Sequence, residues 1–591
     1  MMPNSALNIK SSFLWALTLS LALMQCFFLS DQDWSVEGLE VITGDGRGYY
    51  DYLTSIFIDG DLTHQPINGR YILNVDGVGV NKYYAGTALL MLPFFLLGMF
   101  IAWVTGVPID VFSLPFQLSM CMAALIYAVG GVYFLRRLLA SFDVEVWVKN
   151  ALSFAALFAT NLLYYTAYDL TASHVYSFFA IAAFAWYARQ YFLSQKATDL
   201  LLLAFWFGLT LLIRPVNALV IFSLPFLAGG PSASLHTSRA LFQNAGALVT
   251  ASMIIIGLGL VQLMLYKLQS GSWIVWSYAG EGFYFHRPAF FEFLFGFKRG
   301  WMIYSPLFLL LIPALWKMMK DSRWMAFSWV SYFLLSVYVM SAWWSWHYGG
   351  SYGARPMVDL YAILLLPIGI WLHKSGSQVK QRIIVITIAA LSLLNVVQVR
   401  QMKHGILSAW HMNAGKYFWA FGKFDADRYA HQLGGRDDTK PYHKRSKILY
   451  AGTPKDRDGH WNAKHAKGKA DAVFTPEIEF SLGYTYVFGS LSGERIFIEL
   501  DVESQEYIAG SASSAFLVIE LKDTEGKTKL YDAFRVNEHP GLSLDSWHNM
   551  HYAYSIEEDV KTDDQLKMYL WNKGKGAFAL KINSCEVRAL E

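Results

Sequence analysis

Charged side chains are scarce in this sequence. They make up 16% of its 591 residues, against about 25% in a typical soluble protein. The first 400 residues carry 41 of them, about 10% of that stretch, whereas residues 401–591 carry 52, about 27%. The net charge is only +3. These shortages exclude a single soluble domain, a disordered chain and a nucleic-acid binder built on a basic patch. They leave a multi-span membrane protein with a water-soluble C-terminal part.

Cysteine is nearly absent as well. Of the three cysteines, Cys26 and Cys121 lie in apolar runs, and Cys585 lies alone near the end of the chain. So few cysteines exclude a disulfide framework and a cysteine-based metal site. They also leave the redox compartment undetermined.

What the sequence has in abundance is long apolar runs. A helix rises about 1.5 Å per residue, so about 20 apolar residues cross about 30 Å of hydrocarbon. Eleven runs predict membrane spans, although 199–230 can also be one hairpin broken at Arg214. The predicted spans are 12–30, 113–135, 150–168, 172–193, 199–217, 218–230, 245–266, 301–316, 324–342, 357–372 and 383–399.

A further apolar run, 85–105, decides the predicted topology. If this run crosses the membrane, the basic residues between the later spans lie outside, against the positive-inside rule. If it lies in the interface or re-enters, they are all cytoplasmic, together with Lys10. We therefore expect eleven spans, a cytoplasmic N-terminus and an external C-terminal part. The deciding residues are Arg136, Arg137, Lys196, Lys317, Lys320, Arg323, Lys374, Lys380 and Arg382.

The first predicted span, 12–30, is interpreted as an uncleaved anchor. A signal peptide is the alternative, but no small-x-small cleavage pattern precedes Asp31. In the expected orientation the polar and aromatic loops lie on the outer face, whereas the inner loops are plain connectors. The outer loops are 31–84, 168–173, 267–300 and 343–356.

Residues 401–591 predict a separate domain. The charged and aperiodic stretch 401–475 indicates a connector. Between 476 and 591, seven runs of β-branched and aromatic residues alternate with turn residues, as in an antiparallel, jelly-roll-like β-sandwich. One interpretation is a sugar-binding module, in which Trp547, Tyr569 and Trp571 stack against sugar rings. The interpretation that we favour is a lid or spacer domain with core aromatics. The predicted strands are 477–488, 495–502, 516–522, 529–536, 547–556, 565–571 and 577–587.

A glycine-rich acidic motif follows the first span. Residues 44–52 read Gly-Asp-Gly-Arg-Gly-Tyr-Tyr-Asp-Tyr. Glycines let a backbone approach a ligand closely. At a membrane surface, Asp45 or Asp51 can act as a general base toward an acceptor hydroxyl or amine. Arg47 and Tyr49 place a cation and an aromatic ring beside these carboxylates. A simply solvated acidic loop is an alternative of equal weight.

Cations and aromatic residues recur in the other outer segments. Lys82 is expected at headgroup depth, where it can pair with a lipid phosphate or serve as a snorkelling anchor. The segment 343–356 combines aromatic residues, glycines and Arg355. Indole rings stack on sugars, and Arg forms forked bonds to phosphate. We favour this function over an interfacial aromatic belt. Arg299 adds a cation at the start of a span, and Arg214 is expected to face a cavity.

The order of these motifs resembles the C-type glycosyltransferases of the protein mannosyltransferase and aminoarabinose transferase group. The resemblance covers residues 10–400 as a pattern. It rests on the acidic motif after one span, the Asp-Gly-Asp-Leu turn at 59–62, and Asn-Lys-Tyr at 81–83 leading into Leu-Pro-Phe at 92–94. Two motifs depart from the family pattern: Lys-Pro-Pro reads Lys-Tyr-Tyr here, and the Asp-Glu pair reads Asp-Gly. These departures leave the base and the donor open.

The resemblance implies an enzyme that takes a sugar from a polyprenyl-phosphate carrier on the outer leaflet. It maps the family's acidic residue onto Asp45 and its lipid-phosphate lysine onto Lys82. The family's juxtamembrane helices would correspond to residues 85–105. The family's aromatic second outer loop would correspond to the segment that ends at Asp169 and is followed by His174. Family members differ in their need for a divalent cation, so no cofactor is assigned.

We therefore expect an inverting glycosyltransferase in a bacterial inner membrane, with a periplasmic C-terminal domain. It would move a hexosyl or pentosyl group to a glycolipid, polysaccharide or protein. The alternatives are a transporter or flippase for a lipid-linked sugar, which would need mid-span charges or an internal repeat, and a non-catalytic envelope assembly protein. The candidate catalytic residues are Asp45 and Asp51; the phosphate ligands are Lys82, Arg47, Arg299 and Arg355; the substrate contacts are Tyr49, Asp169, His174, Trp346, His347 and Tyr352.

Overall fold

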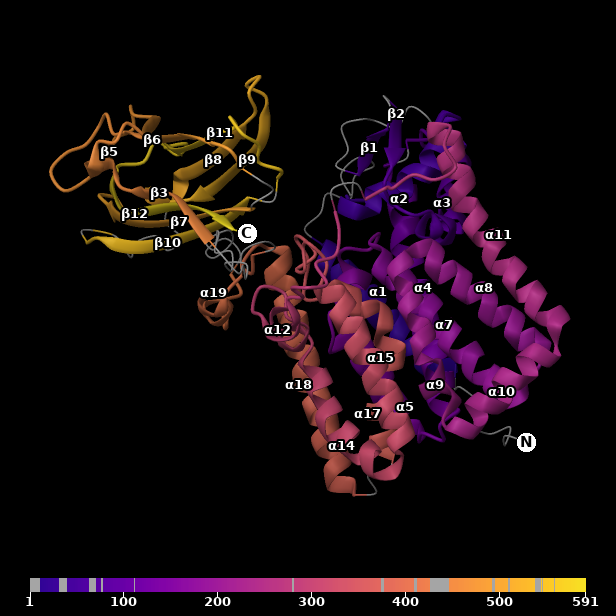
Figure 1. The fold of residues 1–591 in the computed structure, drawn as a ribbon. Helices are drawn as coiled ribbons and strands as arrows, with labels where there is room; N and C mark the ends of the chain where they lie inside the picture. The colour runs from indigo at the N-terminus through magenta and orange to yellow at the C-terminus, as the bar shows by residue number, and fades with distance from the viewer. Residues whose placement is uncertain are drawn as a thin grey trace. The chain divides into compact units, whose positions relative to one another are not determined.

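The computed structural model of the chain contains two compact units, residues 1–400 and 401–591, each of which is described by itself. The first is mostly helical and the second is built of strands (Figure 1). The residues described are 11–30, 40–62, 71–75, 78–110, 112–278, 281–373, 377–408, 412–425, 446–491, 495–508, 511–536, 544, 546–556 and 558–590.

The helical unit begins with one long helix, followed by a short helical and β-hairpin segment. These elements are α1 (Ser11–Leu29), α2 (Gly44–Thr54), a π-helical turn (Ser55–Asp59), β1 (Ile72–Val75) and β2 (Val78–Asn81). The helices that follow are α3 (Gly86–Thr105), α4 (Leu114–Ala140), α5 (Val146–Phe158), α6 (Leu162–Ala167), α7 (Ser173–Ser194), α8 (Ala197–Ile213), the 3₁₀ segment Pro215–Ser223, α9 (Leu224–Ala228), α10 (Pro231–Gln243) and α11 (Ala245–Ser270).

The second half of the helical unit contains several interrupted helices. They are α12 (Phe290–Phe295), α13 (Trp301–Tyr304), a 3₁₀ turn (Pro306–Leu310), α14 (Leu311–Asp321), α15 (Arg323–Ser341), a second 3₁₀ turn (Arg355–Leu360), α16 (Tyr361–Leu364), α17 (Leu366–His373) and α18 (Gln378–Lys403). In Figure 1, α2, β1 and β2 lie at one end of this unit, and α10 and α14 lie toward the other.

Eleven spans are not confirmed. Among the described residues, seven helices are long and apolar enough to cross a membrane, or eight if the bent pair 215–241 counts as one. The predicted span 150–168 is divided between α5 and α6, and 301–316 is interrupted near Pro306. The second break falls at a proline, which removes a backbone donor and disfavours helix in the residue before it. Hydropathy does not register such breaks, so it merges separate helices into single spans.

The disputed run 85–105 forms the helix α3. This helix has 20 residues and meets the length and composition requirements of a span. Its length therefore does not distinguish a crossing helix from an interfacial one, and the orientation of the chain stays a prediction.

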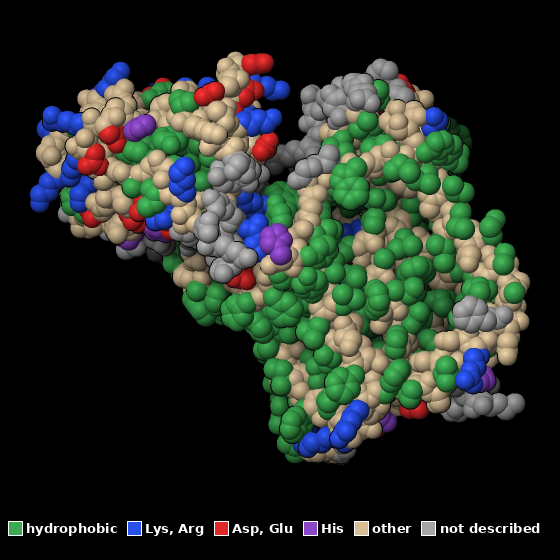
Figure 2. Space-filling view, in the orientation of Figure 1, with side chains coloured by type: hydrophobic (Ala, Val, Ile, Leu, Met, Phe, Trp, Pro, Cys, Tyr) green, Lys and Arg blue, Asp and Glu red, His purple; other side chains and the backbone are tan. Residues whose placement is uncertain are grey.

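The outside of the helical unit is broadly apolar (Figure 2). Large apolar side chains that are mostly exposed occur on several helices, among them Trp103 (73%), Ile312 (70%) and Ile386 (68%). Contiguous apolar surface of this kind indicates contact with something other than water. Together with helices of spanning length, it indicates a membrane protein.

The second unit is a β-sandwich of two five-stranded sheets. One sheet has the order β10-β7-β12-β3, with β5 also paired to β12, and the other has the order β4-β6-β11-β8-β9. The strands are β3 (Ser446–Gly452), β4 (Trp461–Asn462), β5 (Ala472–Phe474), β6 (Phe480–Val487), β7 (Arg495–Glu506), β8 (Phe516–Lys522), β9 (Thr528–Arg535), β10 (His548–Ile556), β11 (Gln565–Trp571) and β12 (Phe578–Leu590). A short helix, α19 (Ala414–Trp419), precedes them.

All seven predicted strands are present, but the predicted connector is wrong in part. Within 401–475 the structure contains α19, β3, β4 and β5, and these strands pair with β12 and β6. They are two to seven residues long, so their alternation is too brief to be recognised among charged residues. The segment 426–445 lies outside the described residues.

Candidate functional site

The acidic motif is held against two other segments by its glycines. Residues 44–54 form α2, which begins at Gly44 with a positive φ of +53°. A side chain at Gly46 would collide with Thr171, and one at Gly48 would collide with the ring of Tyr83. Only glycine permits these approaches. The glycine spacing therefore joins the first outer loop to the segment before α7.

Asp45 lies in the first turn of α2 and has a partner on each carboxylate oxygen. The Oδ2 atom forms an ion pair with Arg355 Nη1 at 2.9 Å. The Tyr83 hydroxyl donates to Oδ1 at 2.7 Å. The Asp45 and Arg355 side chains still expose 32% and 21% of their surface. Both therefore remain accessible to a ligand.

The electrostatic surroundings of Asp45 come from several elements. Burial disfavours its ionised form, but Arg355 and the Tyr83 hydroxyl outweigh this cost, with further attraction from His174 and Lys82, so the pKa of Asp45 lies below its ordinary value. Asp45 is therefore a carboxylate at neutral pH. These four residues lie 37 to 310 positions away from Asp45 in the sequence.

Lys82 lies close to this group and has a partner of its own. Its Nζ atom forms an ion pair with Glu281 Oε1 at 2.8 Å. The same atom lies 5.6 Å from the ring centre of Tyr83 and 5.4 Å from that of Tyr278. A phosphate binding here would compete with Glu281 for the ammonium group. Glu281 and Tyr278 carry no local motif and were not predicted.

A buried cluster behind the ion pair is centred on Asp359. His174 Nδ1 lies 2.7 Å from Asp359 Oδ1, and Arg214 Nη1 lies 3.2 Å from Oδ2. Asp359 has no exposed side-chain surface, whereas Arg214 exposes 19%. A buried carboxylate between an imidazole and a guanidinium fixes the positions of both groups. Asp359 was not predicted, although an acid within the apolar run 357–372 is a signal that marks such a residue.

Asp169 lies near the same ion pair. Burial raises its pKa to about 7; Arg355 opposes this shift and the negative charge of Asp45 adds to it. Two carboxylates therefore act on one guanidinium. A group that titrates near neutrality in such a place is a candidate acid or base.

Asp51 and Arg47 belong to another face of α2. Successive helical residues are about 100° apart, so Asp45 and Tyr49 share a face whereas Asp51 points elsewhere. The Tyr71 hydroxyl donates a short hydrogen bond to Asp51, and the Arg47 guanidinium lies 4.7 Å from the Phe112 ring centre. Burial raises the pKa of Asp51. Of the two predicted bases, only Asp45 contacts Arg355.

Tyr49 lies on the same face of α2 as Asp45 and is buried. Its ring packs on Tyr83 with centres 4.7 Å apart. Burial, followed by repulsion from Asp45, raises its pKa to about 12, so Tyr49 keeps its proton at neutral pH. Its hydroxyl interacts with Ser173 at the start of α7.

The remaining predicted residues are less directly placed. Arg299 is buried, and the residues with which it interacts electrostatically include Tyr304, Tyr165 and Tyr164. Tyr352 is buried and donates its hydroxyl to Asn395 and Gln398 of α18, so its role in the structure is packing. Trp346 and His347 lie together in a turn in which His347 accepts from the backbone of Gly349 at 3.2 Å.

No protein-family model matches the chain, and no curated protein sequence matches it. Among solved structures, it is similar to arabinosyltransferase EmbB from Mycobacterium smegmatis, with 11% identity and a TM-score of 0.35 over 100% of this chain and 66% of that one. It is also similar to the oligosaccharyltransferase AglB from Archaeoglobus fulgidus in its apo form, with 10% identity and a TM-score of 0.39 over 73% and 61% of the two chains.

A shorter solved structure is similar to a part of the chain. The xylan-binding CBM22-1 domain from Paenibacillus barcinonensis aligns with 25% of this chain and 99% of its own length, at 20% identity and a TM-score of 0.16. All of these TM-scores are below 0.5, so the similarities carry no argument about activity, donor or acceptor. The chain spans about two thirds or less of the two membrane enzymes.

The geometry itself defines what the site can do. An ionised carboxylate, a partly exposed guanidinium and an ammonium group share one region, and a buried acid holds a further Arg and a His beside it. The cations can bind an anionic leaving group. The carboxylate can accept a proton from a nucleophile.

Proposed function

We propose that this chain is a membrane glycosyltransferase that moves a sugar from a polyprenyl-phosphate carrier to an acceptor outside the cytoplasm. The observation that carries the proposal is the ion pair between Asp45 and Arg355, with Lys82 beside it. A carboxylate next to accessible cations combines a base with a phosphate-binding group. A tethering protein has no need for such an arrangement.

In the proposed reaction, Asp45 takes the proton of the acceptor hydroxyl or amine. The acceptor atom forms a bond to the anomeric carbon while the bond from that carbon to the phosphate oxygen breaks. The electron pair of that bond leaves with the polyprenyl phosphate, whose charge Arg355 and Lys82 stabilise. Attack from the face opposite the phosphate inverts the anomeric configuration.

Donor binding also prepares the base. In the free protein both oxygens of Asp45 are engaged, by Arg355 and by Tyr83. A donor phosphate attracts the guanidinium of Arg355 and weakens its ion pair with Asp45. The pKa of Asp45 then rises and its oxygen becomes available to the acceptor. In the free protein Asp45 is therefore a weak base, and it becomes a stronger one when the donor binds.

The direct test supplies polyprenyl-phosphate-linked hexoses and pentoses to the purified chain in lipid nanodiscs, with acceptors found by mass spectrometry of glycolipids and glycoproteins in cells that lack it. Asp45→Asn should lower kcat by at least about 100-fold, the smaller end of what a general base supplies. Asp51→Asn is the matched control, because Asp51 lies on another face of α2, and it should retain most turnover. Near-normal turnover of Asp45→Asn would overturn the assignment.

A further inference from the structure

The outward face of one sheet in the β-sandwich carries a row of aromatic side chains. Along β11, Leu566, Met568 and Leu570 point into the core, so Tyr569 and Trp571 point outward. The outward aromatic residues of the four neighbouring strands are Phe480, Tyr569, Trp571, Phe516 and Tyr531. Trp547, which was predicted to stack against sugar rings with Tyr569 and Trp571, lies instead directly before β10 of the other sheet.

These aromatic residues lie close to one another and are partly open to solvent. Phe480 exposes 54% of its surface and Tyr531 exposes 53%. The rings of Phe480 and Trp571 are nearly parallel, at an interplanar angle of 10°, and Phe480 and Tyr569 meet edge to face. A cluster of this size on an otherwise charged domain indicates a binding surface.

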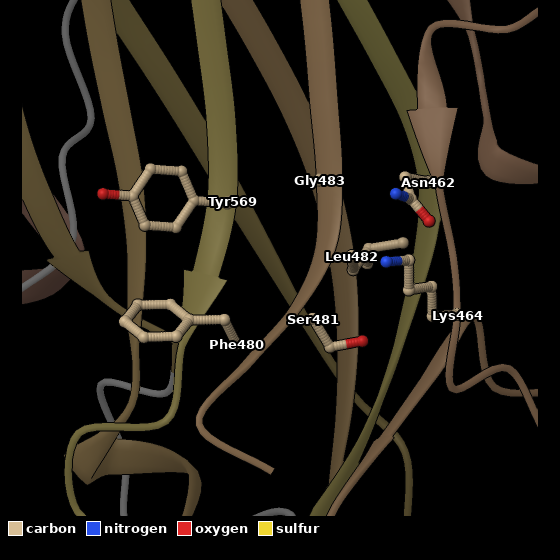
Figure 3. A pocket seen from close by; sticks show the side chains of 7 residues that line it. All are labelled: Asn462, Lys464, Phe480, Ser481, Leu482, Gly483 and Tyr569. Carbon is tan, nitrogen blue, oxygen red and sulfur yellow. The ribbon is translucent and has the colours of Figure 1, made fainter.

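A cavity of about 390 Å³ opens on this face, within the size range of about 300–1,000 Å³ of small-ligand sites. The rings of Phe480 and Tyr569 lie on one side of it, and Asn462 and Lys464 lie on the other (Figure 3). Its floor is formed by residues 481–483 of β6.

The backbone creates this cavity by an irregularity in strand pairing. The register between β11 and β6 shifts between Met568 and Leu570, and Leu482 has a positive φ of +52°. Such bulges change the direction of side chains next to binding sites. Gly483 follows, and an added Cβ there would meet no atom within 4 Å. The space beside Tyr569 is therefore open because this position has no side chain.

We propose that this cavity binds a pyranose ring of an oligosaccharide. A sugar ring presents apolar C–H faces and a rim of hydroxyl groups. The faces match the rings of Phe480 and Tyr569, and the rim matches the amide of Asn462 and the ammonium of Lys464. An apolar peptide or lipid chain would match the two rings but would form no hydrogen bond with Asn462 or Lys464. The proposal does not rest on the glycosyl-transfer activity, because the cavity lies within the β-sandwich alone.

The test measures binding of xylohexaose, cellohexaose, mannohexaose and trigalacturonic acid to the full chain in nanodiscs by isothermal titration calorimetry. Phe480→Ala and Tyr569→Ala should each weaken binding of the sugar that binds best by about tenfold or more, as loss of a central aromatic contact does in other interfaces. Tyr569→Phe should retain binding. Tyr507→Ala is the matched control, since Tyr507 is equally exposed (49%) but follows β7 of the other sheet.

A second variant fills the cavity without removing an aromatic ring. Gly483→Val should fold, because its Cβ has room and a β-branched residue suits a strand, yet it should lower affinity. Lys464→Met distinguishes an acidic glycan from a neutral one. Selective loss of trigalacturonic acid binding indicates an acidic glycan, and unchanged xylohexaose or cellohexaose binding indicates a neutral one. The proposal is overturned if the wild-type chain binds none of the probes at millimolar concentration, or if Gly483→Val and Tyr569→Ala bind as it does.

Discussion

The residue that decides the state of Asp45 is Arg355, which makes the strongest attractive contact with the carboxylate. Replacing Arg355 by Gln removes this attraction, so the pKa of Asp45 rises toward and above its ordinary value. A base must be ionised, so activity is lost as pH falls through its pKa. In the proposed enzyme, Arg355→Gln should therefore move the acid limb of the kcat/KM profile to higher pH, besides lowering its plateau.

Lys82→Gln is the comparison for this experiment. Lys82 acts on Asp45 more weakly than Arg355 does and is paired with Glu281. Loss of the Lys82 ammonium group should lower the plateau of the kcat/KM profile, because the phosphate binds more weakly. The acid limb should move much less than it does in Arg355→Gln. An acid limb that stays in place in Arg355→Gln would mean that the titrating group is not Asp45.

Asp169 gives a prediction about stability. Its pKa of about 7 exceeds the ordinary value of 3.8, so the folded chain favours the protonated form. Ionisation then costs stability, and this cost grows as pH rises from about 4 through 7. Asp169→Asn should raise the melting temperature at pH 8 and raise it much less at pH 5, as measured by thermal unfolding in detergent.

An exposed carboxylate serves as the control for this measurement. Asp559 exposes 78% of its side chain, and Asp559→Asn should change the melting temperature equally little at both pH values. If Asp169→Asn lowers the melting temperature at pH 8, the ionised carboxylate stabilises the fold through Arg355, and the environment described for Asp169 is wrong.

Individual residues were predictable from sequence to different extents. Asp45, Lys82 and Arg355 stand out because each is a charge within a glycine- or aromatic-rich motif, and the structure brings all three together. Asp359 and Glu281 pair with cations from distant elements. Such pairs are fixed by tertiary packing, which no local pattern encodes. Tyr352 lies in an aromatic- and glycine-rich segment that predicts a substrate contact, but its side chain is buried against α18.

At the scale of elements, the contact between α2 and the segment before α7 depends on Gly46. Gly46→Ala would place a Cβ against Thr171, and overpacking of this kind costs about 1–3 kcal/mol. The variant should be less stable to heat and should lose transfer activity, because Asp45 is the preceding residue. Adding Thr171→Gly to Gly46→Ala should restore part of both.

Gly257→Ala in α11 is the matched control, since an added Cβ there meets no atom within 4 Å. It should leave the melting temperature almost unchanged. A Gly46→Ala variant as stable as Gly257→Ala would contradict the close approach of α2 to Thr171. If the double variant Gly46→Ala/Thr171→Gly loses as much stability and activity as Gly46→Ala alone, the added methyl group does not clash with Thr171.

Strands were easier to predict than helices in this chain. Strands such as β7 and β11 show alternating burial over most of their length, as in the pattern of Leu566, Met568 and Leu570 in β11, so period-two patterning predicts them. The helical unit is apolar on lipid-facing and core-facing sides alike. Its helix ends are set by residues such as Pro306 and by packing, so hydropathy predicts the amount of helix but not its divisions.

At the scale of the whole chain, orientation in the membrane is the central prediction. Within the helical unit, α2 and the β-hairpin lie at the end opposite α10 and α14 (Figure 1). Lys320 lies in the last turn of α14 and Arg323 begins α15, and the positive-inside rule keeps such residues in the cytoplasm. The Asp45 region would then face outward, as a donor on the outer leaflet requires.

Labelling of single cysteines in intact spheroplasts tests this orientation. The native cysteines are first replaced by serine, and cysteine is introduced at Glu525, in the exposed turn between β8 and β9, or at Lys380, in the exposed first turn of α18. A membrane-impermeant maleimide should label the Glu525→Cys protein at once and the Lys380→Cys protein only after permeabilisation. The reverse pattern would place the β-sandwich and the Asp45 region in the cytoplasm, where a donor on the outer leaflet does not reach them.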